Sequence, residues 1–250
     1  MPALGNEIIR LEEVASTNSL VLERPAYLER HGLVVVARHQ TGGRGRMGRR
    51  WASLPGRQLQ FSVVLHPPFP TADFPAVALL AGLAVAQACE EELGVRPDLK
   101  WPNDVMLVGR KVCGILVEGS SGAGGRPRLV VGIGINCQGD PGDFPAELQA
   151  HLTTLAHETS RPVDPEALLQ TVLERLEALL ERLAAGDKAA MLEQWRGYGL
   201  LGEGQRVRFT TQQGPREGIP EGLTPEGYLI VRLPDGSAVI QVSGELEWMM

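Results

Sequence analysis

The chain has 250 residues, 43% of them hydrophobic, and carries a formal net charge of -6. This hydrophobic content suffices for a packed core and excludes a disordered chain, and the acidic balance argues against general nucleic-acid binding. The sequence shows neither a signal-peptide pattern nor an apolar run of about 18 residues, so we expect a cytoplasmic protein that does not enter a membrane.

The predicted elements begin with alternating strands and helices. Four runs of β-branched and aliphatic residues are apolar on both parities, as in strands buried on both faces. These strands are predicted over residues 33–37, 59–65, 114–119 and 129–136. Helices are predicted over residues 74–94, from Pro165 to about Gly186 with Asp164 as the N-cap, and over residues 187–196.

The texture changes near Gly197, where short strands and tight turns begin. Strands are predicted over residues 205–211, 227–234 and 238–248, and Pro234-Asp235-Gly236 joins the last two as a hairpin. We therefore expect two domains. A mixed β-sheet packed against helices is predicted over residues 1–198, and a small C-terminal β-barrel over residues 199–250.

The cysteines and histidines form no metal or disulfide pattern. Cys89, Cys113 and Cys137 are scattered without a C-x-x-C spacing, and the five histidines form no H-x-x-x-H pair. An odd number of thiols suits a reducing compartment. No structural metal site is predicted.

Residues 40–51 read QTGGRGRMGRRW, with four arginines and four glycines in twelve positions. Glycines let backbone N–H groups approach an anion, arginines donate to phosphate oxygens, and the indole of Trp51 offers a stacking face for a base. The literal G-x-G-x-x-G match over residues 43–48 is not a dinucleotide fingerprint, because Pro55-Gly56 follows instead of a helix. The stretch is too short for an RGG tract that binds nucleic acid. A solvated basic turn would explain the charge of the stretch but not its glycines or Trp51. The stretch predicts a loop that folds over a nucleotide.

A second polar cluster occupies residues 99–119, LKWPNDVMLVGRKVCGILVEG. Pro102-Asn103-Asp104 is a turn by its chemistry, and it places Lys100, Trp101, Asn103 and Asp104 between the helix that ends near Gly94 and a short strand. Lys111 stands at the entry to an apolar strand. A lone lysine at a strand end is usually a solvated edge residue, so the cluster does not decide a function by itself.

QTGGRGRMGRRW, KWPND, GRKVCGILVE and GIGIN occur in this order and closely resemble the motifs of the biotin protein ligases. Ser16-Thr17-Asn18 fits the element that precedes the arginine loop in that family. The resemblance implies an α+β fold with a class II synthetase-like catalytic domain. It also implies the activity: biotin and ATP give biotinyl-5′-AMP and pyrophosphate, and biotin then passes to a lysine of a biotin carboxyl carrier domain of a carboxylase. Mg²⁺ is expected to accompany ATP.

The resemblance also assigns roles to individual residues. Biotin contacts are expected from Ser16, Thr17, Asn18, Gln40, Gly43, Arg44, Lys111, Gly114, Gly132 and Gly134. ATP and adenylate contacts are expected from Arg46, Arg49, Trp51, Asn103, Lys111 and Asn136. Catalytic roles are expected for Lys111 and Arg46, and for Asp104, which would accept the proton that the carrier lysine loses or orient its amine.

Several points depart from the family or leave alternatives open. Met47 replaces a basic or polar residue of many relatives, and the terminal GELEWMM leaves a contribution of the barrel to the nucleotide site open. Only about 15 residues precede Ser16, so we expect no helix-turn-helix domain and no DNA binding. A homodimer formed through a sheet edge is left open. The rival functions are a lipoate or octanoate enzyme of the same fold and a non-catalytic nucleic-acid-binding or adaptor protein.

Overall fold

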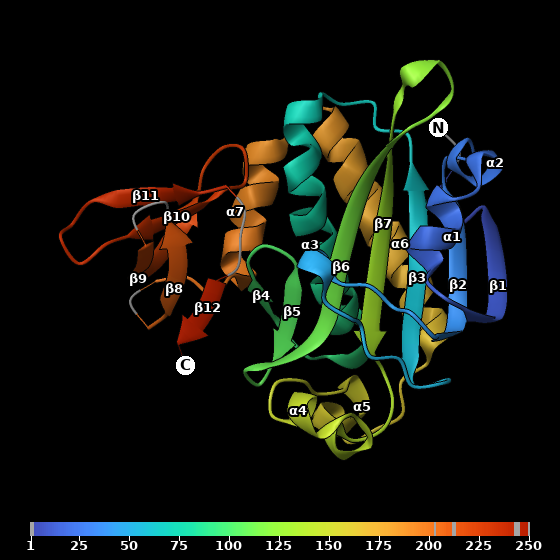
Figure 1. The fold of residues 1–250 in the computed structure, drawn as a ribbon, viewed down its shortest axis with the longest axis horizontal. Coiled ribbons are helices and arrows are strands. Elements are labelled where there is room, and N and C mark those ends of the chain that lie inside the picture. The colour runs from blue at the N-terminus through green and yellow to red at the C-terminus, as the bar shows by residue number, and fades with distance from the viewer. Residues whose placement is uncertain (1–2, 203, 212–213, 243–245, 250) are drawn as a thin grey trace.

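The computed structural model describes residues 3–202, 204–211, 214–242 and 246–249, which form two β-sheets and the helices around them (Figure 1). The strands are β1 (Glu7–Val14), β2 (Leu33–Gln40), β3 (Gln58–Leu65), β4 (Asp98–Lys100), β5 (Asp104–Leu107), β6 (Arg110–Ser121), β7 (Pro127–Asn136), β8 (Arg206–Thr211), β9 (Gly214–Leu223), β10 (Leu229–Arg232), β11 (Ala238–Gln241) and β12 (Leu246–Met249). The α-helices are α1 (Thr17–Leu22), α2 (Pro25–Leu28), α3 (Phe74–Leu93), α4 (Ala146–Gln149), α5 (Leu155–Thr159), α6 (Pro165–Ala184) and α7 (Lys188–Tyr198). Short 3₁₀ turns lie at Arg46–Gly48, Thr71–Asp73, Ala123–Gly125 and Pro141–Asp143.

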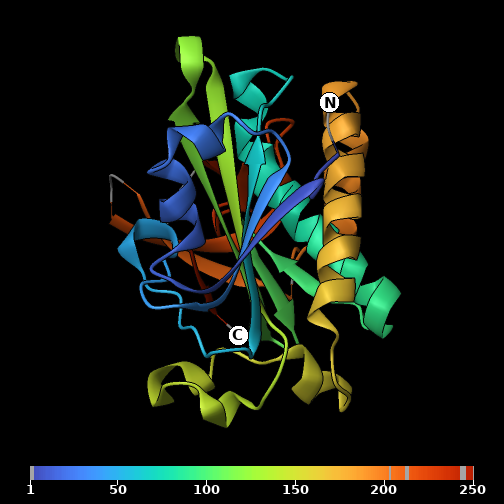
Figure 2. The same cartoon turned by 90° about the vertical axis from the view of Figure 1, so that its right-hand side faces the viewer.

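The larger sheet has seven strands in the order β1-β2-β3-β7-β6-β5-β4. β1 pairs with β2 in parallel, and every other neighbouring pair is antiparallel, so the sheet is mixed. Helices α3 and α6 cover one face, and α1 with the chain that follows β2 lies over the other (Figure 2). The predicted mixed sheet packed against helices is confirmed.

Helix α3 is apolar nearly all round because it is enclosed by the sheet, α6 and α7. Its length and composition would suit a membrane span, but most of its residues are buried inside this fold. Gly94, with a φ of 67°, ends it. The predicted start of α6 is confirmed, since Asp164 accepts hydrogen bonds from the backbone N–H groups of Glu166 and Ala167.

One row of directly opposed residues crosses the sheet and prepares the site. Lys100 on β4 faces Asp104 on β5, which faces Gly114 on β6, and the row continues to Gly134 on β7 and Gln60 on β3. Opposed residues of adjacent strands lie on the same face of a sheet. This face is the one that α1 covers, because α1 contacts β3 and β7 there. Two charged residues, two glycines and a glutamine thus form one floor.

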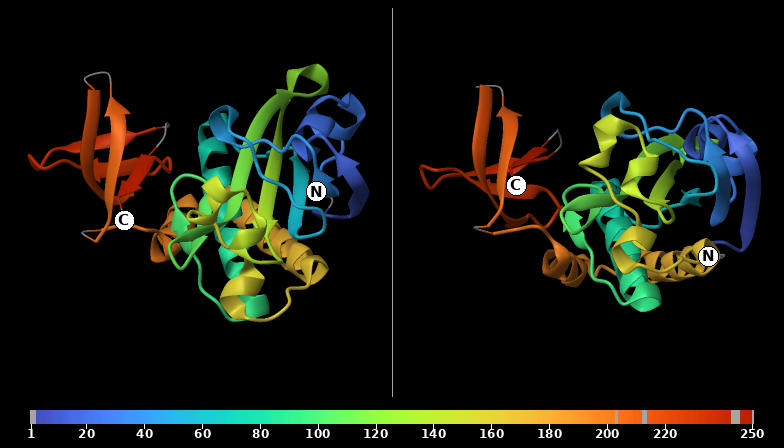
Figure 3. Two further views of the ribbon diagram at one scale, coloured as in Figure 1. Left: turned by 60° about the horizontal axis from the view of Figure 1, so that its bottom comes forward. Right: turned by 90° about the horizontal axis from the view of Figure 1, so that it is seen from below.

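The C-terminal strands form an open five-stranded sheet, so the predicted barrel is wrong. The strand order is β11-β10-β9-β8-β12, with no pairing between β11 and β12 in the described ranges (Figure 3). The predicted strand over residues 238–248 is in fact two strands at opposite edges of this sheet. Residues 243–245, between them, lie outside the described part. The hairpin at Pro234-Asp235-Gly236 is confirmed, since β10 pairs with β11.

Two hydrogen bonds join the β4–β5 end of the large sheet to the β9–β10 turn of the small sheet and to the segment between α7 and β8. The indole N–H of the buried Trp101 donates to the carbonyl of Gly227 at 3.0 Å. The backbone N–H of Leu200 donates to the carbonyl of Leu99 at 3.0 Å. Strand β12 is thereby brought beside β4, at the charged end of the row. The division at residues 198 and 199 stays a prediction.

Candidate functional site

A cavity of about 180 Å³ lies between this face of the large sheet and the loop that follows β2. Fourteen of the sixteen predicted site residues line this cavity: Ser16, Thr17, Asn18, Gln40, Arg44, Arg46, Arg49, Trp51, Asn103, Asp104, Lys111, Gly114, Gly132 and Gly134. Gly43 and Asn136, the other two, do not line it. The sequence elements that resemble a ligase therefore converge on one hollow.

The arginine loop is a compact hairpin. Arg44 and Arg50 form an antiparallel bridge, and the N–H of Gly45 donates to the carbonyl of Arg49 at 2.7 Å. At its tip Met47 has a φ of 56° and is 67% exposed. The base is closed by Gly43, where a Cβ would lie 2.7 Å from the carbonyl oxygen of Trp51. Gly43 is thus required by the loop's own geometry.

One end of the cavity is a network of neutral polar side chains. Gln40 Oε1 accepts from the backbone N–H of Thr17 at 2.8 Å and from its hydroxyl at 3.2 Å. The Gln40 amide donates to Gln60 Oε1 at 2.9 Å, and the hydroxyl oxygens of Ser62 and Thr17 lie 2.7 Å apart, within hydrogen-bond distance. Ser16 is the N-cap of α1. Because these buried groups already have partners, they hold their positions without a ligand.

Glu118 on β6 ties two of the predicted biotin residues together. Its Oε2 accepts from Arg44 Nη2 at 2.6 Å and from Asn18 Nδ2 at 2.9 Å. Asn18 Oδ1 in turn accepts from the Ser62 hydroxyl at 2.5 Å. The Arg44 charge is therefore neutralised at the rim of the polar end.

The glycines of the floor make room for side chains of the site. A Cβ at Gly132 would lie 2.4 Å from Asn18 Oδ1, and one at Gly134 would lie 2.7 Å from the indole of Trp51. At Gly114 it would lie 3.0 Å from the Lys111 side chain and 3.1 Å from the indole. The Trp51 indole therefore packs against the bare backbone at Gly114 and Gly134.

The other end of the cavity is charged. Lys111 Nζ lies 2.5 Å from Asp104 Oδ1 and 5.8 Å from the centroid of the Trp51 ring. Arg46 Nη1 donates to Asn103 Oδ1 at 3.0 Å, and the Asn103 amide donates to the carbonyl of Ile115 at 2.8 Å. The predicted turn at residues 102–104 is confirmed, and it fastens the arginine loop to the sheet.

Lys100 also lines this end, although it was not among the predicted site residues. Partial burial lowers its pKa, and the charges of Lys111 and Arg49 lower it further, whereas Asp104 acts in the opposite direction. A lysine whose charge is disfavoured by burial and by neighbouring cations suits a site for an anion.

Asn136 lies behind the cavity rather than in its wall. Its side-chain oxygen accepts from Gln58 Nε2 at 2.8 Å, and its amide donates to the carbonyl of Thr153 at 3.0 Å. Gln58 in turn binds the backbone of Ala52 and Leu54, the segment that leaves Trp51. In this structure Asn136 supports the position of Trp51, and its predicted contact with adenine stays a prediction.

Three residues of the site escaped the sequence interpretation, namely Gln60, Ser62 and Glu118, and Lys100 was named in the polar cluster without a role. The first two sit inside the strand 59–65, where Gln60 and Ser62 are polar at alternate positions of an otherwise apolar run. Polar residues at every second position of a strand that is buried along its whole length indicate that one face lines a polar site, and this pattern could have identified Gln60 and Ser62. Glu118 lay within a quoted motif but carried no distinctive pattern.

Two family models match the chain. The model of the Biotin/lipoate A/B protein ligase family matches residues 11–136, and that of the Biotin protein ligase C terminal domain matches residues 204–247. Biotin–[acetyl-CoA-carboxylase] ligase of Paracoccus denitrificans is 35% identical over 210 residues, covering 82% of this chain and 86% of that protein. The chain belongs to the biotin protein ligase family.

Further relatives extend this result to nearly the whole chain. The bifunctional ligase/repressor BirA of Bacillus subtilis is 33% identical over 233 residues, covering 93% of this chain and 71% of that protein. The solved structure of the Aquifex aeolicus biotin protein ligase in complex with biotin and ATP matches with a TM-score of 0.85 and 32% identity. This match covers 98% of this chain and 99% of that one, so both sheets belong to the family fold.

The rival reading of an acyl transferase of the same fold requires a reactive thiol. Cys89, Cys113 and Cys137 are fully buried, and burial raises the pKa of each thiol, to about 12 for Cys137. None of the three lines the cavity. Buried thiols of raised pKa are poor nucleophiles, which disfavours that reading for this biotin protein ligase family member.

Proposed function

We propose that this chain activates biotin with ATP to biotinyl-5′-AMP and transfers biotin to a lysine of a biotin carboxyl carrier domain of a carboxylase. The observation that carries this proposal is the division of the cavity, with neutral donors and acceptors around Gln40 and cations around Lys111. Biotin has a ureido ring at one end and a carboxylate at the other. Membership of the biotin protein ligase family supports the same assignment.

The polar end suits the ureido ring. Ser16, Thr17 and Gln40 supply hydroxyls and an amide, and burying a ureido group without such partners costs about 2–7 kcal/mol. Asn18 and Arg44 close this end through Glu118. The bare backbone at Gly132 leaves room for the Asn18 side chain at this end.

The charged end suits the first half-reaction. A carboxylate oxygen of biotin attacks the α-phosphorus of ATP, forming the acyl–phosphate bond while the bond to the bridging oxygen breaks and pyrophosphate leaves. Lys111 attracts both anions, and Arg46 and Arg49 neutralise charge on the phosphates. Trp51 offers its indole to adenine, and Asn103 holds Arg46 in place.

The second half-reaction forms an amide bond. The amine of the carrier lysine attacks the activated carbonyl, AMP leaves, and the amine loses a proton. Asp104 is the carboxylate at this end and is our candidate for accepting that proton. Its ion pair with Lys111, which we assign to the biotin carboxylate, supports this role.

Mg²⁺ would enter as part of Mg·ATP. The described residues contain no group of three or more histidine, cysteine or acidic side chains that could hold a metal ion. The phosphates themselves are the ligands that Mg²⁺ prefers. A cytoplasmic location, a homodimer and the absence of DNA binding stay predictions.

The decisive experiment is incubation of the protein with biotin and Mg·ATP, followed by mass spectrometry for biotinyl-5′-AMP and an assay for pyrophosphate. Adenylate should form with biotin, and Arg46→Ala and Lys111→Met should each lower its rate at least tenfold. Arg126→Ala, on an exposed hairpin remote from the cavity, is the matched control and should leave the rate unchanged. Formation of an adenylate from lipoate or octanoate but not biotin would refute the substrate, and activation of no acid would refute the activity.

A further inference from the structure

Two lysine–tryptophan pairs flank Asp104. Lys111 Nζ lies 5.8 Å from the centroid of the Trp51 ring, and Lys100 Nζ lies 5.8 Å from the centroid of the Trp248 ring. Asp104 forms an ion pair with Lys111 and faces Lys100 directly across the β4–β5 pair. Each cation is therefore held between the carboxylate and an aromatic face.

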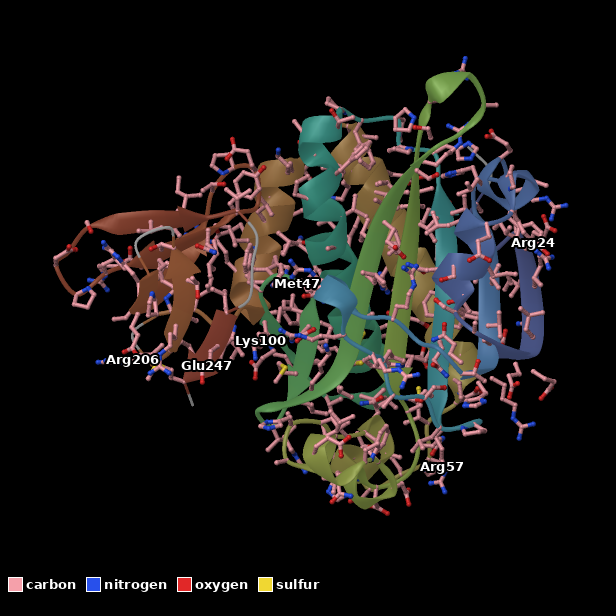
Figure 4. The ribbon with its side chains drawn as sticks, viewed as in Figure 1. Arg24, Met47, Arg57, Lys100, Arg206 and Glu247 are labelled. Atoms are coloured by element: carbon pink, nitrogen blue, oxygen red, sulfur yellow. The ribbon has the colours of Figure 1, made fainter. Side chains whose placement is uncertain are left out.

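Trp248 belongs to the other sheet. It lies on β12, where Leu246 and Trp248 are half-buried against the core while Glu247 and Met249 are exposed. Leu246 lines the cavity, so the buried side of β12 forms part of the cavity wall next to Lys100. Figure 4 shows Lys100 at the margin of the large sheet, toward the strands that carry Glu247 and Arg206. The C-terminal sheet thus reaches the charged end.

The indole of Trp248 is fixed by packing rather than by a hydrogen bond. Its Nε1 is buried and has no hydrogen-bond partner among the described residues. A buried indole nitrogen without a partner costs free energy, so a hydrogen bond does not account for the position of this ring. The contact that the structure provides is the ammonium of Lys100.

The Trp248 ring adds to the attraction that Asp104 exerts on the Lys100 ammonium. Against this attraction, burial removes part of the hydration of Lys100, and the charges of Lys111 and Arg49 repel it. A lysine side chain is flexible and turns its ammonium toward water when nothing holds it. An aromatic face attracts the cation without neutralising its charge, so the ammonium stays available to an anion.

We propose that Trp248 is a positioning residue for adenylate formation, holding Lys100 where its ammonium binds the phosphate oxygens of ATP. This proposal rests on the proposed function and deepens it. It predicts that loss of Trp248 weakens the binding of ATP and leaves the binding of biotin unchanged, because Trp248 does not belong to the polar network around Gln40.

The first test compares Trp248→Ala, Trp248→Phe and Lys100→Met in biotin-dependent exchange of pyrophosphate into ATP. Trp248→Ala should raise the KM for ATP about tenfold while the KM for biotin stays within about twofold, and Trp248→Phe should recover most of the loss. Adding Trp248→Ala to Lys100→Met should cause no further loss, since both remove the same contact. Met249→Ala, on the exposed side of the same strand, is the matched control.

Equal rises in the KM for ATP and the KM for biotin, or additive losses in the double variant, would show that Trp248 only packs in the cavity wall and does not position Lys100. Either result would overturn the proposal. An unchanged KM for ATP would also overturn it.

A second test does not depend on biotin activation. The chain has three lysines, Lys100, Lys111 and Lys188, so ¹³C-dimethylated protein gives a simple NMR spectrum. The Lys100 signal, assigned by its loss in Lys100→Met, should show an upfield ring-current shift that Trp248→Ala abolishes and Met249→Ala retains. If the wild type forms no adenylate but this shift is present, the proposed function fails and the contact stands. If the shift is absent, the inference fails whatever the activity.

Discussion

Arg46 and Asn103 join the arginine loop to the sheet, because Arg46 Nη1 donates to Asn103 Oδ1 at 3.0 Å. Asn103 is itself anchored on β6. Its side-chain amide donates to the backbone carbonyl of Ile115, and its backbone carbonyl accepts from the Ile115 N–H. Asn103, in the turn before β5, thus fastens the arginine loop to the sheet.

Replacing Asn103 by alanine should release the loop. A hydrogen bond to a charged group contributes about 1.5–3 kcal/mol, so we expect the KM for ATP to rise at least about tenfold. Trypsin should cut faster after Arg46, Arg49 or Arg50. Gln194→Ala, on the exposed side of α7, serves as the control, and equal cleavage rates for all three proteins would contradict the role of Asn103.

Gly132→Ala should damage the polar end. Its Cβ would lie 2.4 Å from Asn18 Oδ1 and must displace the side chain that binds Ser62 and Glu118. Overpacking of this kind costs about 1–3 kcal/mol of the free energy of unfolding, which urea denaturation measures. The KM for biotin should rise more than the KM for ATP. Gly142→Ala, where nothing lies within 4 Å, should change neither.

Asp104→Asn separates the two half-reactions. If the carboxylate accepts the proton of the carrier lysine, transfer from purified biotinyl-5′-AMP should slow at least about tenfold while adenylate formation changes less. Asparagine keeps the shape, so the β4–β5 turn should remain intact. If both rates fall in proportion, Asp104 acts by holding Lys111 and the proton-acceptor role is wrong.

The charged Lys100 side chain should lower the free energy of unfolding at neutral pH. Its pKa in the folded protein lies below the ordinary 10.5, so between these two values the unfolded chain binds more protons and stability rises with pH. Below that range the charged lysine is unfavourable in the folded state. Lys100→Met should therefore raise Tm at pH 7, and its advantage should shrink as pH approaches 10.5. A gain independent of pH would exclude this cause.

The three thiols should resist modification. Because Cys89, Cys113 and Cys137 are buried with raised pKa values, a disulfide reagent at pH 8 should label none of them rapidly in the folded protein. In denaturant all three should react. Fast labelling of a folded thiol would revive the acyl-transferase alternative.

Much of the site was predictable because it lies in contiguous motifs. Arg46, Lys111 and the turn at Asn103 stand in short segments whose glycine and proline content fixes the local chain. What brings Lys100, Asp104 and Gln60 into one row is the pairing of β4, β5, β6, β7 and β3. That register depends on contacts between strands far apart in the sequence, which local patterns do not encode.

The barrel failed for a related reason. Short strands with tight turns suit both a barrel and an open sheet, and only the pairing of the edge strands distinguishes them. Residues 238–248 read as one strand, but Ala238–Gln241 and Leu246–Met249 lie at opposite edges. This division is also what places Trp248 beside Lys100, a contact that no local pattern predicts.

The row from Gln60 to Lys100 has a consequence for selectivity by length. Four steps between neighbouring strands, at about 4.8 Å each, span about 19 Å. Backbone hydrogen bonds between the strands fix that spacing, so the distance between the two ends of the row cannot change. On the proposed function, an acid longer or shorter than biotin would place its carboxylate over a different strand, away from the Lys111–Asp104 pair. A variant that accepts an acid of another length would then need different side chains along the row, because the spacing of the strands stays the same.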